Sequence, residues 1–420
     1  LHVHLDGSLR PTTVLELSAG RDIGYEFETV EDVLAVCQVP EDCESLVDYL
    51  RVFDITLKLM QEAEPLTRIA YELAEDAHHE NVRYMEVRYS PLLHTDKGLT
   101  YDEIVAAVQK GLDRAHRQYG IVCGQIICGI RHISAESSLD LADLAVRWKG
   151  RGVVGFDLAG AEKDYPAKDH VEAFQRVLNH NVNITIHAGE AFGAPSIHQA
   201  LHYCRAHRIG HGTHLNQDPD LMNWVNDRRI PIEICLASNL QTKAIPDYQS
   251  HPIRRFMEEG MRVCLNTDNR LVSDTTVTNE YALAVAAFVA EYRIEVSVDG
   301  QQWTEVARND RNDRALDVNF SPRSARFIRI EQTGRADRWW WSIHGVKVKS
   351  GPFTPKPTAQ ASHNDVQTGA DNLLQALDNR PDTRWSSRAL WIVSSQRDSL
   401  RRQGRASGLG RRSRSSPEGL

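Results

Sequence analysis

Two histidines lie one residue apart at the start of the chain, His2 and His4 in "LHVHLDGS". On a β-strand, residues i and i+2 point to the same face, so the two imidazoles would project together. Neutral imidazole is a common metal ligand, and the pair therefore suggests half of a metal site. The alternative is two surface histidines in a turn. The metal-site interpretation requires further ligands elsewhere in the chain.

Further candidate ligands end short apolar segments later in the chain. His187 follows the apolar run of "VNITIHAGE", and Asp268 follows that of "RVCLNTDN". Together with His2, His4 and one water molecule, these side chains suit a zinc ion that keeps one position open for catalysis. The sequence therefore predicts a catalytic zinc site made of His2, His4, His187 and Asp268.

Glu190 and His211 are the residues that remain for proton transfer. Zinc lowers the pKa of a bound water towards neutrality, and a neighbouring group must then orient that water and accept its proton. A second group must protonate the atom under attack. Glu190 in "HAGE" and His211 in "RIGHG" can divide these tasks. The alternative for Glu190 is that it only caps the following helix.

We expect one zinc per chain rather than two. Hydrolases built on a barrel of eight parallel strands, the fold predicted below, need a bridging ligand when they hold two metals. This ligand is commonly a modified lysine or a carboxylate at the end of the fourth strand. That strand reads "VVGFDLAG"; it has no lysine, and Asp157 lies three residues before the turn at Gly160.

The elements that would position these residues alternate regularly up to about residue 288. Helical periodicity occurs in stretches such as "SLVDYLRVFDITLKLM" and "YDEIVAAVQKGLDRAHRQYG". Eight segments between such stretches are typical of buried strands: "LHVHL", "VRYMEVRYS", "VCGQIICGIRH", "VVGFDLAG", "VNITIHAGE", "HRIGHGTHL", "IPIEICLASN" and "MRVCLNTDN". Eight strand–helix repeats predict an α/β fold of the (β/α)8 TIM-barrel type, in which active sites lie at the carboxyl ends of the strands.

The pattern changes after residue 290. Period-two alternation in "YRIEVSVDGQQWTEVARND", with turns at "DG" and "SPRSAR", predicts antiparallel β-structure. We divide the chain into a barrel (1–290), an all-β fragment (291–349), a Pro-rich linker with a second fragment (350–390) and a basic tail (391–420). The tail is rich in Arg, Ser and Gly without apolar periodicity, which predicts disorder.

Composition restricts the class of protein. A net charge of -8 and a pI near 6.1 give no reason to expect a nucleic-acid partner, and no apolar run is long enough to span a membrane. All seven cysteines precede residue 265, and none forms a Cys-x-x-Cys pair. This usage fits a reduced, cytoplasmic catalytic part. Leu1 is not an initiator methionine, so we expect the natural N-terminus to lie upstream.

Several motifs, in order, resemble the adenosine deaminase family, especially its bacterial branch. They are "LHVHLDGS", "EVRYSP", "DLAG", "HAGEAFG", "RIGHG", "SNLQT", "HPI" and "LNTDN", spread over about residues 1–288. The resemblance implies zinc-dependent hydrolysis of adenosine, and of 2′-deoxyadenosine, to inosine or 2′-deoxyinosine and ammonia, as in purine salvage. It implies that Glu190 protonates N1 of the purine, that His211 assists the zinc-activated water, and that Asp268 both binds zinc and holds this water.

The resemblance also implies a set of substrate-binding residues: His4, Asp6, Gly160 and Asn269. Asp6 would reach the ribose hydroxyls, and the Gly160 backbone would meet purine N3. Asn269 stands where animal members carry a second aspartate that contacts N7; an amide can also donate to N7, but the base preference becomes open. Tyr49, Leu50 and Phe53 resemble an apolar lid over the substrate. The first strand and the helices after the eighth strand are shorter than in the family, so we expect a barrel truncated at both ends.

Residues 292–348 resemble the C-terminal half of a discoidin-like (coagulation-factor C-type) jelly roll, and residues 361–387 the start of another copy. Such modules often bind sugars or cell surfaces, which would suggest an extracellular location and weak glycan binding by the C-terminal fragment. Each copy is incomplete and should not bury a full core. Trp339, Trp340 and Trp341 could stack on a sugar, or they could be core residues.

Three functions therefore stay open at this point. The first is a zinc aminohydrolase acting on adenosine. The second is a surface-attached carbohydrate-binding protein with an inactive barrel. The third keeps the chemistry but acts on adenine, an adenine nucleotide or a modified adenosine. A cytidine-deaminase type of site is disfavoured, because the Pro-Cys-x-x-Cys element of that class is absent from the sequence.

Overall fold

The computed structural model describes residues 1–288, 292–309, 327–332, 342–343, 357–361, 385–386 and 389–394. Contacts within the chain divide it into two compact units, Leu1–Phe288 and Val289–Leu420. All the side chains with candidate chemistry lie in the first unit.

The first unit is an eight-stranded parallel sheet with its strands in sequence order, as predicted. An additional bridge between Val3 and Asp268 joins the first strand to the end of the eighth and closes the sheet into a barrel. The strands are β1 (Val3–His4), β2 (Tyr84–Tyr89), β3 (Val122–Ile130), β4 (Val153–Ala159), β5 (Asn183–Ala188), β6 (Arg208–His211), β7 (Ile232–Ile234) and β8 (Val263–Leu265). Five of the six residues of both β2 and β5 are buried, as expected for parallel strands covered on both faces.

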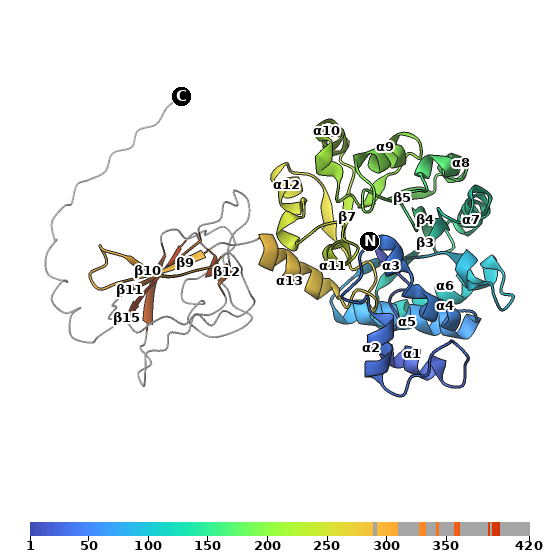
Figure 1. Ribbon diagram of the computed structural model, residues 1–420, viewed down its shortest axis with the longest axis horizontal. Coiled ribbons are helices and arrows are strands. Elements are labelled where there is room, and N and C mark those ends of the chain that lie inside the picture. Colours follow the sequence, from blue (N-terminus) through green and yellow to red (C-terminus); the bar gives the residue numbers. More distant parts are fainter. Residues whose placement is uncertain are drawn as a thin grey trace, which may run out of the picture. The chain divides into compact units, whose positions relative to one another are not determined.

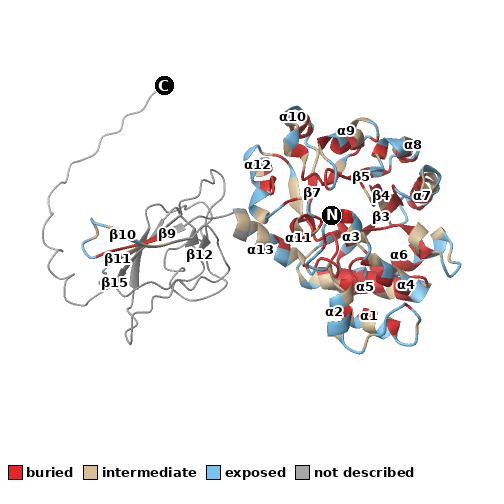
Figure 2. Ribbon diagram, viewed as in Figure 1, coloured by how far each residue is buried: buried red, intermediate tan, exposed pale blue. Residues whose placement is uncertain are grey.

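Helices surround these strands (Figure 1), and their buried faces turn towards the barrel (Figure 2). The helices are α1 (Pro11–Ser18), α2 (Val30–Cys37), α3 (Leu46–Leu50), α4 (Phe53–Leu59), α5 (Ala63–His79), α6 (Tyr101–Tyr119), α7 (Ala135–Trp148), α8 (Val171–Asn179), α9 (Ala194–His202), α10 (Pro219–Asp227), α11 (Leu236–Gln241), α12 (Ile253–Glu258) and α13 (Val277–Phe288). Helix α6 shows the local causes: a Thr100–Glu103 capping box begins it, and left-handed Gly120 ends it.

One predicted helix is wrong in its continuity. The stretch "SLVDYLRVFDITLKLM" forms two short helices, α3 and α4, rather than one. At the junction the amides of Arg51, Val52 and Asp54 bond to carbonyls three residues back, which tightens the turn. The spacing of the apolar residues is the same on both sides of the junction, so the sequence alone suggests a single helix.

The second unit contains a five-stranded sheet in the order β10–β9–β11–β15–β13, antiparallel at every pair. Its strands are β9 (Tyr292–Ser297), β10 (Thr304–Asn309), β11 (Phe327–Gln332), β13 (Pro357–Ala361) and β15 (Ala389–Ser394), and a separate pair joins β12 (Ser342–Ile343) and β14 (Trp385–Ser386). The predicted antiparallel β-structure is confirmed for β9, β10 and β11. The turn at Asp299–Gly300 is also confirmed, with the Asp299 carboxylate accepting bonds from the amides of Gln301 and Gln302.

Two boundaries in this unit are wrong. Residues 357–360 were predicted as linker, but together with Ala361 they form β13. The tail was predicted to be disordered from residue 391, but residues 391–394 continue β15, which pairs with β11 and β13. In the first case a long-range strand partner overrides the Pro-rich composition; in the second, the boundary included the apolar segment "WIVS" in the tail. The predicted "SPRSAR" turn, the remaining tail and Trp339–Trp341 fall outside the described residues.

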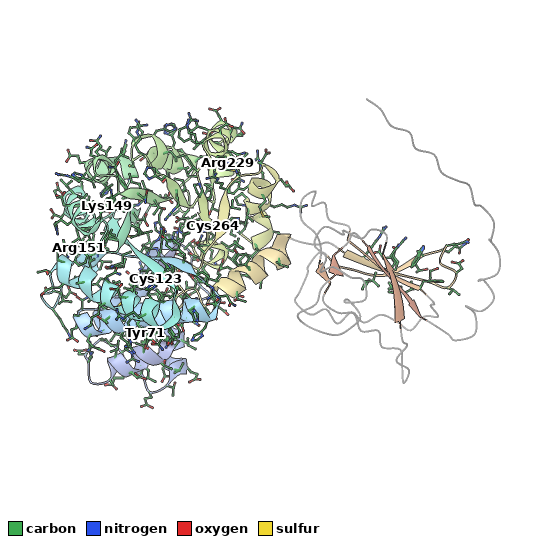
Figure 3. All side chains as sticks on the ribbon, turned by 180° about the vertical axis from the view of Figure 1, so that it is seen from behind. Tyr71, Cys123, Lys149, Arg151, Arg229 and Cys264 are labelled. Carbon is green, nitrogen blue, oxygen red and sulfur yellow. The ribbon has the colours of Figure 1, made fainter. Side chains whose placement is uncertain are left out.

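The seven cysteines are all unpaired. Cys123 and Cys264, the two that are not fully buried, lie on the separate strands β3 and β8 (Figure 3). This agrees with the prediction that the barrel is not a disulfide scaffold. Within the described ranges, no helix combines the length and the apolar character needed to cross a membrane.

Candidate metal centre

Four side chains converge at the carboxyl ends of β1, β5 and β8. One ligand atom from each of His2, His4, His187 and Asp268 lies within 4.8 Å of all the others. Asp268 Oδ1 is 3.3 Å from His2 Nε2 and 3.4 Å from His4 Nε2. His4 Nε2 is 3.1 Å from His187 Nε2. The structure therefore brings together all four predicted ligands, and the surface-histidine alternative is wrong because only 1% of His2 is exposed.

The imidazoles are electrostatically suited to bind a cation. Burial lowers the pKa of His4 well below its usual value and also lowers the pKa of His187, which favours the neutral imidazoles that can bind a cation. Burial alone would raise the pKa of Asp268, but its hydrogen bond to His2 and the neighbouring imidazoles hold it well below its usual range. Three imidazole nitrogens and one carboxylate match the donor set that zinc prefers.

A layer of buried charges holds two of these imidazoles from below. His2 Nδ1 lies 3.1 Å from Glu233 Oε2, and His187 Nδ1 lies 3.0 Å from Asp157 Oδ2. Arg88 bridges the two carboxylates, with 2.8 Å to each. Burial opposes ionisation of both acids, but Arg88 and the imidazoles hold the pKa of Glu233 and of Asp157 well below its usual range. Nδ1 is thus occupied in both rings, which directs Nε2 towards the ligand cluster.

The sequence analysis did not identify Arg88 and Glu233, and it did not assign Asp157 a role in supporting the histidines. A signal was present, because each is a charged residue inside an otherwise apolar strand segment: "EVRYS", "IPIEIC" and "GFDLAG". Fully buried charges occur almost only in pairs or at metals. One buried arginine and two buried acids in three strands of one barrel could therefore have been predicted to form ion pairs with each other.

Two residues of the centre have left-handed backbones, His211 with φ 64° and Asp268 with φ 58°. Non-glycine residues adopt this conformation at a cost of about 1–3 kcal/mol, and such strain is concentrated at functional sites. Residues of α11 hold both side chains: Ser238 Oγ donates to Asp268 Oδ2 at 2.6 Å, and Asn239 Nδ2 lies 2.9 Å from His211 Nδ1. Ser238 and Asn239, in the helix that follows β7, therefore fix the orientation of both side chains.

Glu190 and His211 form a second group beside the ligands. His211 Nε2 is 3.6 Å from Glu190 Oε2, and together with Asp268 they form another close set of ligand atoms. Burial, followed by the charges of Asp268 and Glu162, raises the pKa of Glu190 well above its usual value. Burial lowers the pKa of His211 well below its usual value. A protonated acid next to a neutral imidazole can give one proton and accept another.

The helix-capping alternative for Glu190 is wrong. The N-cap of α9 is Gly193, and no side chain caps this helix. Glu190 is instead 4% exposed, and its Oε1 is buried without a hydrogen-bond partner.

The predicted substrate-binding residues lie around this cluster. Asp6 is buried near His4, with 4.0 Å between its Oδ1 and His4 Nδ1, and burial raises the pKa of Asp6 to about 7. Gly160 has φ 98°, and a Cβ there would lie 2.7 Å from His132 Nδ1, so only glycine suits this turn. Asn269 is buried, and its Nδ2 donates to the Tyr49 hydroxyl at 2.9 Å.

The predicted lid residue Tyr49 has a polar contact that the sequence did not indicate. Its hydroxyl lies 2.7 Å from Ser273 Oγ as well as next to Asn269, and only 2% of the residue is exposed. Leu50 and Phe53 pack at the margin of the small apolar cluster that contains Tyr49. The lid is therefore tied to the segment that follows β8.

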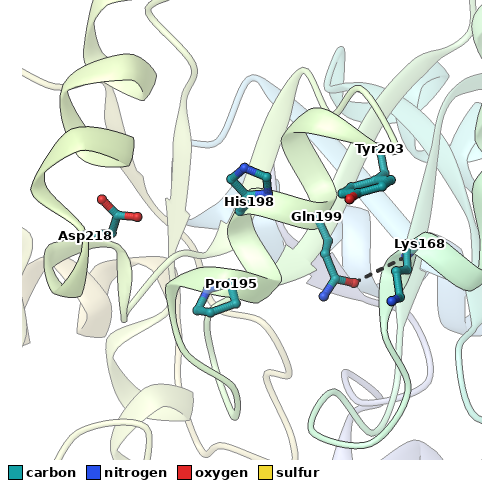
Figure 4. A pocket seen from close by; sticks show the side chains of 6 residues that line it. All are labelled: Lys168, Pro195, His198, Gln199, Tyr203 and Asp218. Atoms are coloured by element: carbon teal, nitrogen blue, oxygen red, sulfur yellow. Dashed lines mark hydrogen bonds between the residues drawn. The ribbon is translucent and has the colours of Figure 1, made fainter.

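A separate hollow of about 320 Å³ lies at α9 (Figure 4). It contains none of the residues of the metal centre; its lining is Lys168, Pro195, His198, Gln199, Tyr203 and Asp218. It adds nothing to the chemistry of the centre.

Comparison with known proteins places this geometry in context. The profile of the adenosine deaminase family matches residues 1–312. The adenosine deaminase of Vibrio atlanticus is 43% identical over 283 residues, which cover 67% of this chain and 84% of that protein. A "Probable adenosine deaminase" of Dictyostelium discoideum is 40% identical over 288 residues; the match covers 69% of this chain but only 37% of that protein. Among solved structures, the apo N6-methyl-AMP deaminase of Arabidopsis thaliana superposes with a TM-score of 0.59 at 32% identity, covering 68% of this chain and 84% of that one.

Proposed function

Because this chain belongs to the adenosine deaminase family, we propose that it hydrolyses adenosine and 2′-deoxyadenosine at C6, giving inosine or 2′-deoxyinosine and ammonia. Water adds to C6, and the bond from C6 to the amino nitrogen then breaks. The observation that carries the proposal is the placement of Glu190 and His211 directly beside the cluster of His2, His4, His187 and Asp268.

We propose that the cluster holds one zinc ion per chain. His2 Nε2 is buried, and the polar atom it faces belongs to another member of the cluster, Asp268 Oδ1 at 3.3 Å, as expected of a nitrogen that shares a cation with that carboxylate. The carboxylates on Nδ1 of His2 and His187 are the usual support of zinc-binding histidines. When bound, zinc supplies a Lewis acid that lowers the pKa of the attacking water.

The proton transfers are assigned to Glu190 and His211. Burial raises the pKa of Glu190 well above its usual value, which favours the protonated carboxyl that can donate a proton to N1 of the purine and make C6 more electrophilic. His211 is neutral and can accept the proton of the attacking water. It can then return this proton to the amino group, which leaves as ammonia when the bond to C6 breaks. Asp268, next to both, holds the water in line with C6 and has its other oxygen fixed by Ser238.

Recognition of the nucleoside is assigned to three positions. Asp6, next to His4, would bind the ribose hydroxyls, and the Gly160 backbone would meet N3. Asn269 would donate its amide to N7. The Tyr49 hydroxyl, which itself contacts Ser273 Oγ, would hold that amide in place. It is important for this orientation because Asn269 Oδ1 has no hydrogen-bond partner.

Replacing Tyr49 by Phe tests this part of the assignment. Loss of the hydroxyl removes one neutral hydrogen bond to Asn269, which typically contributes about 0.5–1.5 kcal/mol. We therefore expect kcat/KM for adenosine to fall about 2- to 10-fold, with zinc content unchanged. Tyr25→Phe, at an exposed position, is the matched control. A Tyr49→Phe enzyme with the kcat/KM of the wild type would exclude the hydroxyl from substrate recognition.

The proposed function itself is tested by incubating the purified, zinc-quantified chain with adenosine and following the absorbance change as inosine forms. Adenine and N6-methyl-AMP, assayed in parallel, address the alternative substrates. Turnover of adenosine with the highest kcat/KM supports the proposal, and faster turnover of either other compound reassigns the substrate. Absence of all turnover in zinc-loaded protein would favour the alternative of an inactive barrel. Glycan binding by the C-terminal segment and its discoidin-like assignment stay predictions.

We also propose that the residues after the barrel contribute nothing to the reaction. Every residue assigned above lies between His2 and Ser273. A chain that ends at Glu291 should keep its kcat/KM for adenosine within about 2-fold, since surface changes remote from a site usually alter free energies by at most about 0.5 kcal/mol. Circular dichroism and zinc content serve as folding controls. A large drop in a folded, zinc-loaded truncation would show that the second unit shapes the site.

A further inference from the structure

Glu162 lies in the loop after β4 and is buried, with 4% of the residue exposed. Its carboxylate accepts hydrogen bonds from four consecutive backbone amides of another loop. Oε1 accepts from Gly189 at 2.6 Å, and Oε2 accepts from Glu190, Ala191 and Phe192 at 3.0, 2.6 and 3.0 Å. This loop connects β5 to α9 and carries Glu190.

The loop at residues 189–192 has no helix or strand of its own to fix it. It follows the last residue of β5, Ala188, and precedes the first residue of α9, Ala194. Apart from Glu162, a hydrogen bond from His214 to the Gly189 carbonyl ties it to the next loop. Gly189 and Glu190 are buried, so their amides need acceptors, and the carboxylate of Glu162 supplies both. The same carboxylate also accepts from the amides of the exposed residues Ala191 and Phe192.

The buried charge of Glu162 is itself supported. Four amide donors stabilise a carboxylate strongly, because each is a charge-assisted hydrogen bond. Arg131 is fully buried nearby and donates to the carbonyls of Leu158 and His187, at 3.2 and 2.5 Å. The carboxylate of Glu162 and the guanidinium of Arg131 attract each other electrostatically. Arg131 thus bonds to the first residue of the segment from His187 to Phe192, and Glu162 bonds to its last four residues.

We propose that Glu162 is a positioning residue for the catalytic acid: it fixes the backbone of residues 189–192 and thereby the place of the Glu190 carboxyl. The proposal rests on the proposed function, in which Glu190 protonates the purine. Glu190 Oε1 has no hydrogen-bond partner, and the other carboxyl oxygen lies 3.6 Å from His211 Nε2, so the backbone of residues 189–192 must place the carboxyl within reach of these neighbours. Glu162 does not bond any of the four ligand side chains, so its effect should fall on the proton transfer rather than on metal binding.

Glu162→Gln is the informative substitution. It keeps the size of the side chain but replaces one acceptor oxygen by an NH2 group, which then faces amide donors. A displacement of about 1 Å in a catalytic group can lower the rate on the order of 10²-fold. We expect kcat to fall by about that factor, with KM within about 3-fold of the wild type and zinc content unchanged. The control is Glu172→Gln, at an exposed position on α8, which should have wild-type kinetics.

A double-mutant cycle separates positioning from general damage to the fold. If Glu162 acts through Glu190, then Glu162→Gln should lower kcat by less than about 2-fold in a Glu190→Gln background, because the group that it positions is already gone. Equal reductions in the two backgrounds, or wild-type kcat in Glu162→Gln itself, would overturn the proposal.

Amide hydrogen exchange of residues 189–192 gives a readout that does not depend on activity. It should be faster in Glu162→Gln and unchanged in Glu172→Gln. Where Glu162→Gln does not fold, Glu162→Asp replaces it: the charge remains but the side chain is one methylene shorter, and faster exchange with reduced kcat is expected. Wild-type exchange and kcat in Glu162→Asp would then refute the proposal. A wild-type chain that does not deaminate adenosine refutes the proposed function instead, and the exchange comparison still reports on the hydrogen bonds of Glu162.

Discussion

His187→Ala is expected to lose both bound zinc and deaminase activity, whereas His211→Ala should keep the zinc and lose the activity. His187 Nε2 lies against His4 Nε2 within the four-residue cluster, so its removal leaves three ligands for the cation. It also leaves Asp157 without its imidazole partner, bonded to Arg88. Without the cation the pKa of the attacking water is no longer lowered, and we expect turnover to fall by at least about 10³-fold.

His211 lies outside the four-ligand cluster but close to it. Its Nε2 faces Glu190, and its other ring nitrogen faces Asn239. Removal of this base should lower kcat by on the order of 10²–10⁴-fold, with the zinc ligands intact. Exposed His198 on α9 gives the control, since His198→Ala should change neither property.

Metal analysis of the active protein and both variants checks this assignment. One equivalent of zinc is expected in the wild type and in His211→Ala, and close to none in His187→Ala. A second binding set is geometrically available, because Glu190, His211 and Asp268 also lie close together. Two tightly bound equivalents, one of which disappears in His211→Ala, would show that both sets hold metal and that His211 is a ligand.

Glu190→Gln is expected to lower kcat by on the order of 10²–10⁴-fold, because it removes a general acid, while zinc content stays unchanged. The side chain keeps its size, so the buried position next to His211 is preserved. Glu172→Gln is again the control for a charge change at an exposed position. Near-normal turnover in Glu190→Gln would remove this residue from the mechanism.

The pH dependence gives an independent check on Glu190. Its pKa is raised by burial, and the protonated form is the one that can donate to N1. Activity that depends on this proton is therefore present below the raised pKa and is lost as pH rises through it. The low residual activity of Glu190→Gln should lack this alkaline decline, which can be seen by comparing kcat/KM against pH for the two proteins. The same decline in both would assign it to another group.

Local patterns in the sequence were sufficient to predict the architecture of the barrel and the four candidate metal ligands. The eight strand segments, the His-x-His spacing of His2 and His4, and the polar residues that end the fifth, sixth and eighth strands are all local patterns. They could be combined without coordinates because parallel barrel strands have their carboxyl ends at one face. Local patterns failed where a distant partner decides the outcome, as at residues 357–360, which pair with β15 despite their Pro-rich, linker-like composition.

The contacts that hold these candidate ligands and Glu190 in place depend on the tertiary structure. Arg88 lies 69 residues from Asp157 and 145 from Glu233, and no local pattern connects the three. Their contacts depend on the register of β2, β4 and β7 around the closed barrel. The contact of Glu162 with residues 189–192 and that of Tyr49 with Asn269 likewise join separate loops. A buried charge or hydroxyl must find its partner in space rather than along the chain, so closure of the barrel determines which groups are paired.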